Sequence, residues 1–139
     1  MTFSDLGIKP ELVKALTKIN ILSPMAVQTK AIPKLLLGNI DAYIGSETGS
    51  GKTLAYLLPI LNKIETSGNA LQIVIVAPTH ELVLQIHQQI VDLSQFSGLG
   101  FRSLALIGSV SVNRQKEKLK KKPHIVVGSP GRLIELIKI

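Results

Sequence analysis

Apolar and polar positions over the first forty residues follow a helical period. Leu12, Leu16 and Ile19 recur at the three- to four-residue spacing that puts side chains on one face of a helix. Proline favours the first turn of a helix, and glycine favours the position just past its end. These signals predict three helices, which open at Pro10, at Ser23-Pro24 and at Pro33, with the third ending at Gly38.

From residue 42 onward, short β-prone runs alternate with helical ones. The run 73–76 is apolar at every position, which is typical of a parallel strand covered by helices on both faces. The predicted strands are 42–45, 71–77, 101–107 and 124–128. The predicted helices are 51–65, 81–93, 112–120 and one from Arg132. This alternation predicts an α/β fold, a three-layer sandwich with a mostly parallel central sheet.

Composition narrows the classes of partner. The 139 residues hold 16 Lys and Arg against 9 Asp and Glu, a net charge of +7, which favours a polyanion. Six of the basic residues lie between Arg114 and Lys122, where Glu117 is the only acid. A solvated helix face is the simpler interpretation of that segment, and a nucleic-acid contact is the alternative. The absence of cysteine, of a signal segment and of an apolar run of about 20 residues favours a cytoplasmic protein without a membrane span.

A phosphate-binding loop is predicted after the first strand. Its residues, which also open a long helix, are Thr48, Gly49, Ser50, Gly51, Lys52 and Thr53. Small residues let backbone N–H groups converge on phosphate oxygens, Lys52 reaches the β- and γ-phosphates, and the Thr53 hydroxyl is a ligand for Mg²⁺. The general pattern has Gly where Ser46 stands, and a glycine-rich turn that binds nothing is the alternative. The loop alone does not separate ATP from GTP.

The surroundings of this loop resemble the first core domain of DEAD-box RNA helicases over essentially the whole chain. Phe3 and the run 21–28, which begins at Ile21 and ends at Gln28, are similar to the family's adenine-recognising Q motif. The resemblance implies that Phe3 stacks on the base, that Ile21 lies at the nucleotide and that Gln28 reads the edge of adenine. A carboxamide that accepts from adenine N6 and donates to N7 should favour adenine over guanine by about 1–3 kcal/mol. The expected cofactors are ATP or ADP with Mg²⁺, in a P-loop NTPase fold of the RecA-like type.

Three further motifs resemble the family's RNA-binding segments. They are Pro78-Thr79-His80-Glu81, the turn Gly108-Ser109, and Ser129-Pro130-Gly131-Arg132. The resemblance implies contacts with the backbone of single-stranded RNA that do not depend on base sequence. His80 stands where the family has Arg, so a phosphate contact there is expected to be weaker. A solvent-facing histidine at a helix start is the alternative for His80. Without the other motifs, helix capping is the simpler interpretation of each short turn.

The sequence does not contain the family's Asp-Glu-Ala-Asp and Ser-Ala-Thr motifs. We therefore expect an N-terminal part of the domain, with a helical Q-motif region over 1–39 and an α/β core over 40–139. Such a truncated chain is expected to bind ATP without appreciable hydrolysis, to rely on a second RecA-like domain in its parent protein, and to self-associate through an unpaired sheet edge. A stand-alone nucleotide- or RNA-binding module is the alternative, and an unrelated P-loop NTPase is opposed by Phe3 and Gln28.

Overall fold

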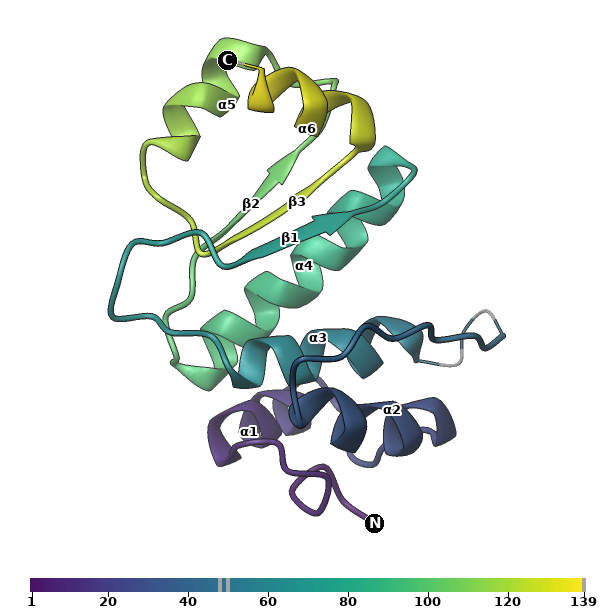
Figure 1. Cartoon of the computed structure of the whole chain (residues 1–139). Helices are drawn as coiled ribbons and strands as arrows, with labels where there is room; N and C mark the ends of the chain where they lie inside the picture. Colours follow the sequence, from purple (N-terminus) through teal and green to yellow (C-terminus); the bar gives the residue numbers. More distant parts are fainter. Residues whose placement is uncertain (48, 50, 139) are drawn as a thin grey trace. The chain divides into compact units, whose positions relative to one another are not determined.

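The structure, a computed structural model, describes residues 1–47, 49 and 51–138. Its contacts group into two compact units (Figure 1). The helical unit comprises Met1–Ile64 with Gln95–Gly98, and the α/β unit comprises Glu65–Ser94 with Leu99–Ile139. The predicted boundary between a helical region 1–39 and a core 40–139 stays a prediction.

The helical unit contains α1 (Pro10–Lys18), α2 (Ala26–Leu36) and α3 (Lys52–Asn62). Pro10 occupies the first turn of α1, as predicted, and Leu12 and Leu16 are fully buried on one face of that helix. The predicted helix start at Pro33 is wrong, because Pro33 lies inside α2. A proline removes one helical hydrogen bond, but its exposed ring and the fully buried neighbour Ile32 allow the helix to continue.

The predicted strand over 42–45 is also wrong. These residues form no strand, and the Tyr43 side chain is 97% exposed. A strand is stable only beside a neighbour that accepts and donates backbone hydrogen bonds. In the part of the chain that the structure describes, no segment forms such a ladder with 42–45. The local β propensity of this run is therefore not realised here.

The α/β unit is built on a parallel sheet of three strands, β1 (Ile73–Val76), β2 (Ser103–Leu106) and β3 (Ile125–Gly128), in the order β1-β3-β2. Each lies inside a predicted strand. Ile125 of the central, fully buried strand β3 pairs in register with Ile73 on one side and Ser103 on the other. The predicted α/β class and parallel sheet are confirmed.

Three helices cover this sheet: α4 (His80–Ser97), α5 (Val112–Leu119) and α6 (Pro130–Ile137). Leu119 of α5 and Leu133 of α6 pack against Leu106 and Val126, so α5 and α6 share one face of the sheet. Figure 1 shows α4 on the opposite face, which makes the unit three-layered. No helix within the described ranges has the length and apolar character needed to cross a membrane.

A buried histidine organises the edge of the sheet where the strands begin. His124 is fully buried, and its Nδ1 accepts a hydrogen bond of 3.0 Å from the backbone N–H of Arg102. Because Nδ1 is the acceptor, the neutral ring carries its proton on Nε2, which lies 2.9 Å from the carbonyl oxygen of Gly68. His124 thus joins the segment before β1 to the starts of β2 and β3.

Candidate functional site

The predicted phosphate loop leads into α3. Gly49 and Gly51 have left-handed backbone angles, φ +79° and +88°, which glycine adopts without a steric penalty. Gly51 is the N-cap of α3, and the Lys52 ammonium in the first turn donates a 2.8 Å hydrogen bond to the carbonyl oxygen of Ser46. The Lys52 side chain therefore reaches back to Ser46, six residues earlier in the sequence. Thr48 and Ser50, also predicted to bind nucleotide, lie outside the described residues.

Gln28 ties α2 to this loop. Its side chain is 2% exposed. The amide oxygen accepts a 2.8 Å hydrogen bond from the N–H of Met25, which caps α2, and the amide nitrogen donates one of 3.1 Å to the carbonyl oxygen of Gly51. A Cβ at Gly51 would overlap that amide nitrogen. The sequence predicted a contact with adenine at Gln28, but the bond to the loop is not visible in the motif. A carboxamide retains one further lone pair and one further N–H for a ligand.

The other predicted nucleotide contacts have different surroundings. The Phe3 ring is 2% exposed and belongs to the apolar interior of the helical unit, while Ile21 is half-buried just after α1. Base stacking requires an accessible ring face, so the proposed role of Phe3 needs the N-terminal segment to move. The roles of Phe3 and Ile21 stay predictions.

Thr53, the predicted Mg²⁺ ligand, lies in the first turn of α3 and hydrogen-bonds to Tyr56. Burial raises the pKa of the Tyr56 phenol, so it stays neutral and available to that hydroxyl. Among the described residues, no three His, Cys, Asp or Glu side chains are grouped to hold a metal ion. Magnesium commonly arrives with nucleotide phosphates and few protein ligands, so a Thr53 hydroxyl beside Lys52 fits a metal delivered by the nucleotide.

The three predicted RNA motifs meet at the carboxyl ends of the parallel strands, where α4, α5 and α6 begin (Figure 1). His124 lies at the other end of the strands. The His80 ring lies close to Gly108, where an added Cβ would be 3.6 Å from His80 Nε2. The Thr79 hydroxyl caps α4 by accepting from the N–H of Leu82 at 3.1 Å. The N–H of Ser129 donates to the carbonyl oxygen of Leu106 at 3.2 Å, which fixes the start of α6. Most of the predicted RNA-binding positions are exposed, namely Pro78, Thr79, His80, Glu81, Gly108, Ser109, Pro130 and Gly131.

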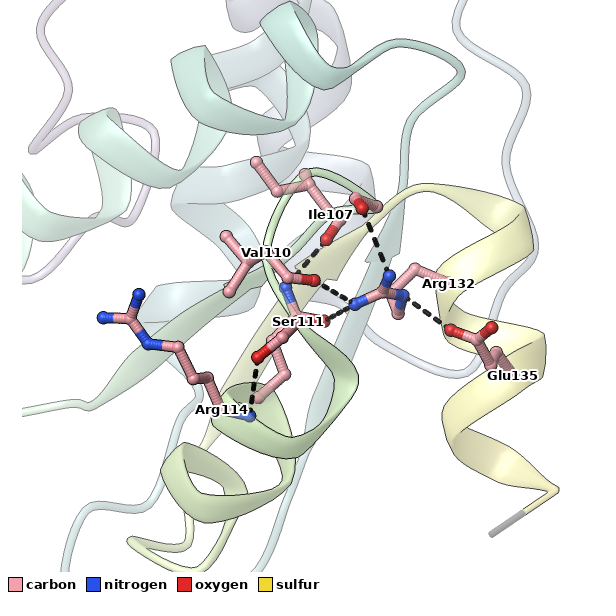
Figure 2. Close-up of polar contacts among 8 residues, drawn as sticks. Ile107, Val110, Ser111, Arg114, Arg132 and Glu135 are labelled. Carbon is pink, nitrogen blue, oxygen red and sulfur yellow. Dashed lines mark hydrogen bonds and ion pairs between the residues drawn. The ribbon is translucent and has the colours of Figure 1, made fainter.

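Arg132 differs from these exposed positions. Its guanidinium donates to the carbonyl oxygens of Val110 at 2.6 Å and Gly108 at 3.3 Å (Figure 2). It also donates to the side-chain oxygen of Gln115 at 2.8 Å and forms a salt bridge of 2.8 Å with Glu135. The Arg132 side chain is only 10% exposed. These contacts join the 108–110 turn to α6.

Gln115 completes this network and was not predicted from the sequence. It is buried on α5, and its amide nitrogen donates a 2.9 Å hydrogen bond to the carbonyl oxygen of Ile107. A glutamine in a strongly basic helix gives no local sign of burial, since only its place opposite Arg132 makes it structural. Together, Gln115 and Arg132 fix both sides of the turn that contains Gly108 and Ser109.

Comparisons with known proteins identify the family. The family model of the DEAD/DEAH box helicases matches residues 25–139. The chain is 44% identical over 132 residues to the DEAD-box ATP-dependent RNA helicase CshC of Bacillus cereus, covering 95% of this chain and 33% of that relative. It is 49% identical over 115 residues to the probable ATP-dependent RNA helicase YfmL of Bacillus subtilis, covering 83% of this chain and 30% of that one.

A solved structure of the DEAD-box helicase Mss116 bound to single-stranded RNA and UDP-BeF superposes with a TM-score of 0.90 and 31% identity. The superposition covers 99% of this chain and 30% of that structure. The chain thus spans about a third of the length of the relatives that it matches. With the matched residues forming most of the sequence, the chain belongs to the DEAD/DEAH box helicase family.

Proposed function

We propose that the chain is the ATP-binding part of an ATP-dependent RNA helicase that remodels or unwinds RNA. The observation that carries this proposal is the hydrogen bond between Gln28 and Gly51, because it joins the segment expected to read the base to the loop expected to hold the phosphates. Relatives named as ATP-dependent RNA helicases over 95% of the chain support it.

In this proposal, Lys52 and Thr53 act on the phosphate end of the nucleotide. Lys52 exchanges its bond to Ser46 for the β- and γ-phosphates, and Thr53 turns its hydroxyl toward Mg²⁺. The bound nucleotide supplies the phosphoanhydride bond whose cleavage drives remodelling. The positive end of α3 and the backbone N–H groups of the loop add to the attraction for the phosphates.

RNA lies, in this proposal, across the starts of α4, α5 and α6. The exposed segments there offer backbone N–H groups and hydroxyls, which bind phosphates and sugars without reading base sequence. Because Arg132 is engaged by Val110 and Gln115, it supports this surface through the 108–110 turn rather than by offering a free cation. His80 provides an exposed imidazole at the same edge.

Titration calorimetry with ADP and GDP in Mg²⁺ tests the nucleotide site. We expect ADP to bind more tightly than GDP by about 5- to 150-fold, the equivalent of 1–3 kcal/mol. Lys52→Ala should abolish binding of both nucleotides, whereas Lys14→Ala, a control at an exposed lysine in the same unit, should change neither affinity.

Gln28→Ala separates reading of the base from support of the loop. If Gln28 reads adenine, the ratio of ADP to GDP affinity should collapse toward one. If it only holds Gly51, both affinities should fall by the same factor and the ratio should be kept. Equal binding of ADP and GDP by the unmodified protein would overturn the assignment to ATP.

Hydrolysis by this chain alone should be negligible. Its sequence holds no Asp-Glu-Ala-Asp run to position water, and the family resemblance places arginine fingers in a second RecA-like domain. An arginine finger alone contributes about 10³- to 10⁵-fold in rate. RNA-stimulated ATP turnover by the purified chain would disprove this, whereas binding without turnover is also what a stand-alone binding module would show.

A cytoplasmic location stays a prediction.

We also propose that copies of the chain associate through the unpaired side of strand β1. Within the residues that the structure describes, strand β1 pairs with β3 on one side only, and its Val74 and Val76 are 55% and 59% exposed. An apolar groove of about 420 Å³ runs beside them and is lined also by Ile134 and Ile137 of α6. Unpaired apolar edges favour pairing between copies. Sedimentation analysis should show association that Val74→Lys abolishes, and a monomer at all concentrations would refute it.

A further inference from the structure

A row of cations runs along α5 and the turn that follows it. Arg114 and Lys118 lie four residues apart on one face of α5, and Lys121 and Lys122 follow just past the end of the helix at Leu119. All four are exposed, and we call them the α5 basic stripe. Among the described residues, the nearby acid Glu117 pairs with Lys120 at 2.8 Å, and no stripe member takes part in an ion pair.

The fold holds this stripe toward solvent. On the other side of α5, buried Gln115 bonds to the carbonyl oxygen of Ile107, and Leu119 packs against the core formed with Leu106 and Val126. These contacts prevent the helix from rotating its cations inward. Figure 2 shows the Arg114 side chain directed away from the network around Arg132.

The stripe starts beside the predicted RNA-binding turn. Ser111 caps α5 by accepting a 3.3 Å hydrogen bond from the N–H of Arg114, and Gly108-Ser109 precedes that cap by only two residues. Arg114 and Lys118, both inside α5, are separated by a helical rise of about 6 Å, and Lys121 and Lys122 follow within three residues of the helix end. The first cation of the stripe thus follows the turn by five residues in the sequence.

Lys122 adds an independent observation. Its φ of +54° lies in the left-handed region, and the other described non-glycine residues with positive φ are Asn20 and Asn39. Asparagine tolerates this conformation, whereas a long side chain such as lysine rarely adopts it. Arg102 fixes the strained turn by donating a 3.0 Å hydrogen bond to the carbonyl oxygen of Lys122. A strained residue that also places a cation at the end of a basic row points to a role for that cation.

We propose that the α5 basic stripe is a second RNA contact, which binds the phosphates of RNA that extends beyond the stretch held at the starts of the three helices. The proposal rests on the proposed RNA function and deepens it by giving the protein a preference for longer RNA. An anionic membrane fits less well, because α5 and the following turn expose no large hydrophobic side chain for insertion within the described residues.

Fluorescence anisotropy with labelled RNAs of about 6 and about 20 nucleotides tests the stripe across a salt series. The triple variant Arg114→Gln, Lys118→Gln, Lys121→Gln should lower the slope of log affinity against log salt by about 2 for the longer RNA, since each lost single-strand contact removes about 0.7. Its affinity for the longer RNA should fall at least tenfold at low salt. Affinity for the short RNA should stay within twofold.

The matched control is Lys14→Gln, Lys30→Gln, Lys34→Gln, which removes the same charge at three exposed lysines of the helical unit. It should leave the salt slope for both RNAs unchanged. If the two triple variants behave alike, the stripe is only a solvated face and the inference fails. If the unmodified protein binds neither RNA, the RNA part of the proposed function fails with it. Stripe-dependent binding to phosphatidylserine vesicles with no effect on RNA would also overturn the inference.

Lys122→Gly provides a second test, in which thermal stability and RNA affinity should change in opposite directions. Glycine relieves the left-handed backbone, so the melting temperature should rise, while the lost cation should weaken binding of the longer RNA by about 3- to 10-fold. Asn39→Gly, at φ +55° in the helical unit, should not weaken RNA binding. RNA affinity that is unchanged in Lys122→Gly removes Lys122 from the stripe and contradicts the role inferred from its strain.

Discussion

Replacing Arg132 by alanine should destabilise the α/β unit through a neighbour rather than through a lost surface charge. The substitution leaves the side-chain oxygen of Gln115 without its donor, and Gln115 is only 1% exposed, so water cannot readily replace the guanidinium. A buried acceptor left unsatisfied costs about 1–3 kcal/mol. The salt bridge to Glu135, whose side chain is 50% exposed, adds about 0–1 kcal/mol, which gives a total of about 1–4 kcal/mol.

Urea unfolding of the wild type, Arg132→Ala, Arg132→Lys and Glu135→Gln measures this free energy. Arg132→Lys keeps the charge but cannot reach several acceptors at once, so it should lose about half as much stability as the alanine variant. In a double-mutant cycle, Arg132→Ala and Gln115→Ala should be coupled by more than about 1 kcal/mol. A loss below about 0.5 kcal/mol in Arg132→Ala, or additive effects of the pair, would refute the stabilising role of the bonds from Arg132 to Gln115 and the 108–110 turn and favour a direct RNA contact at Arg132.

Three further substitutions probe the fold. Gly51→Ala should destabilise the protein more than Gly49→Ala in urea unfolding, because both positions have positive φ but only a Cβ at Gly51 overlaps the Gln28 amide; equal losses would disprove that contact. His124→Ala should cost about 2–4 kcal/mol, since it leaves two backbone groups unpaired and empties a buried site, and a loss under about 1 kcal/mol would contradict this. Burial, with a smaller contribution from Lys118, holds the pKa of His87 below its ordinary 6.5, opposed by a hydrogen bond to the backbone of Ser103. The unfolded chain therefore takes up that proton more readily, stability should fall as pH drops below about 6.5, and His87→Gln should flatten the pH profile of unfolding.

The sequence predicted the elements whose cause is local. Strand β1 was predicted because 73–76 is apolar at every position, and α1 because proline opens a periodic apolar run. The sequence did not show that 42–45 forms no strand, because strand pairing depends on a neighbour far along the chain. Pro33 misled for the opposite reason, since a buried neighbour outweighs a local helix-breaking signal.

In the candidate site, too, the sequence predicted what depends on local motifs and missed what depends on distant partners. The motifs led to the correct family and to segments that meet at one edge of the sheet, but a motif does not say how a side chain's hydrogen bonds are shared between ligand and fold. Arg132 was predicted as an RNA contact and is engaged by Val110 and Gln115. Gln115 itself carries no signal in the sequence, because its partner is on another element. The ligand contacts assigned to individual residues stay predictions.

The two ends of the Gln28 amide have opposite chemical demands. The oxygen faces a donor, the N–H of Met25, and the nitrogen faces an acceptor, the carbonyl of Gly51. A glutamate has nearly the same shape but, when ionised, offers only acceptors, so it would satisfy the helix cap and repel the loop. Exchanging one nitrogen for an oxygen thus separates two segments that are 23 residues apart in sequence, and it does so without changing the volume of the buried side chain.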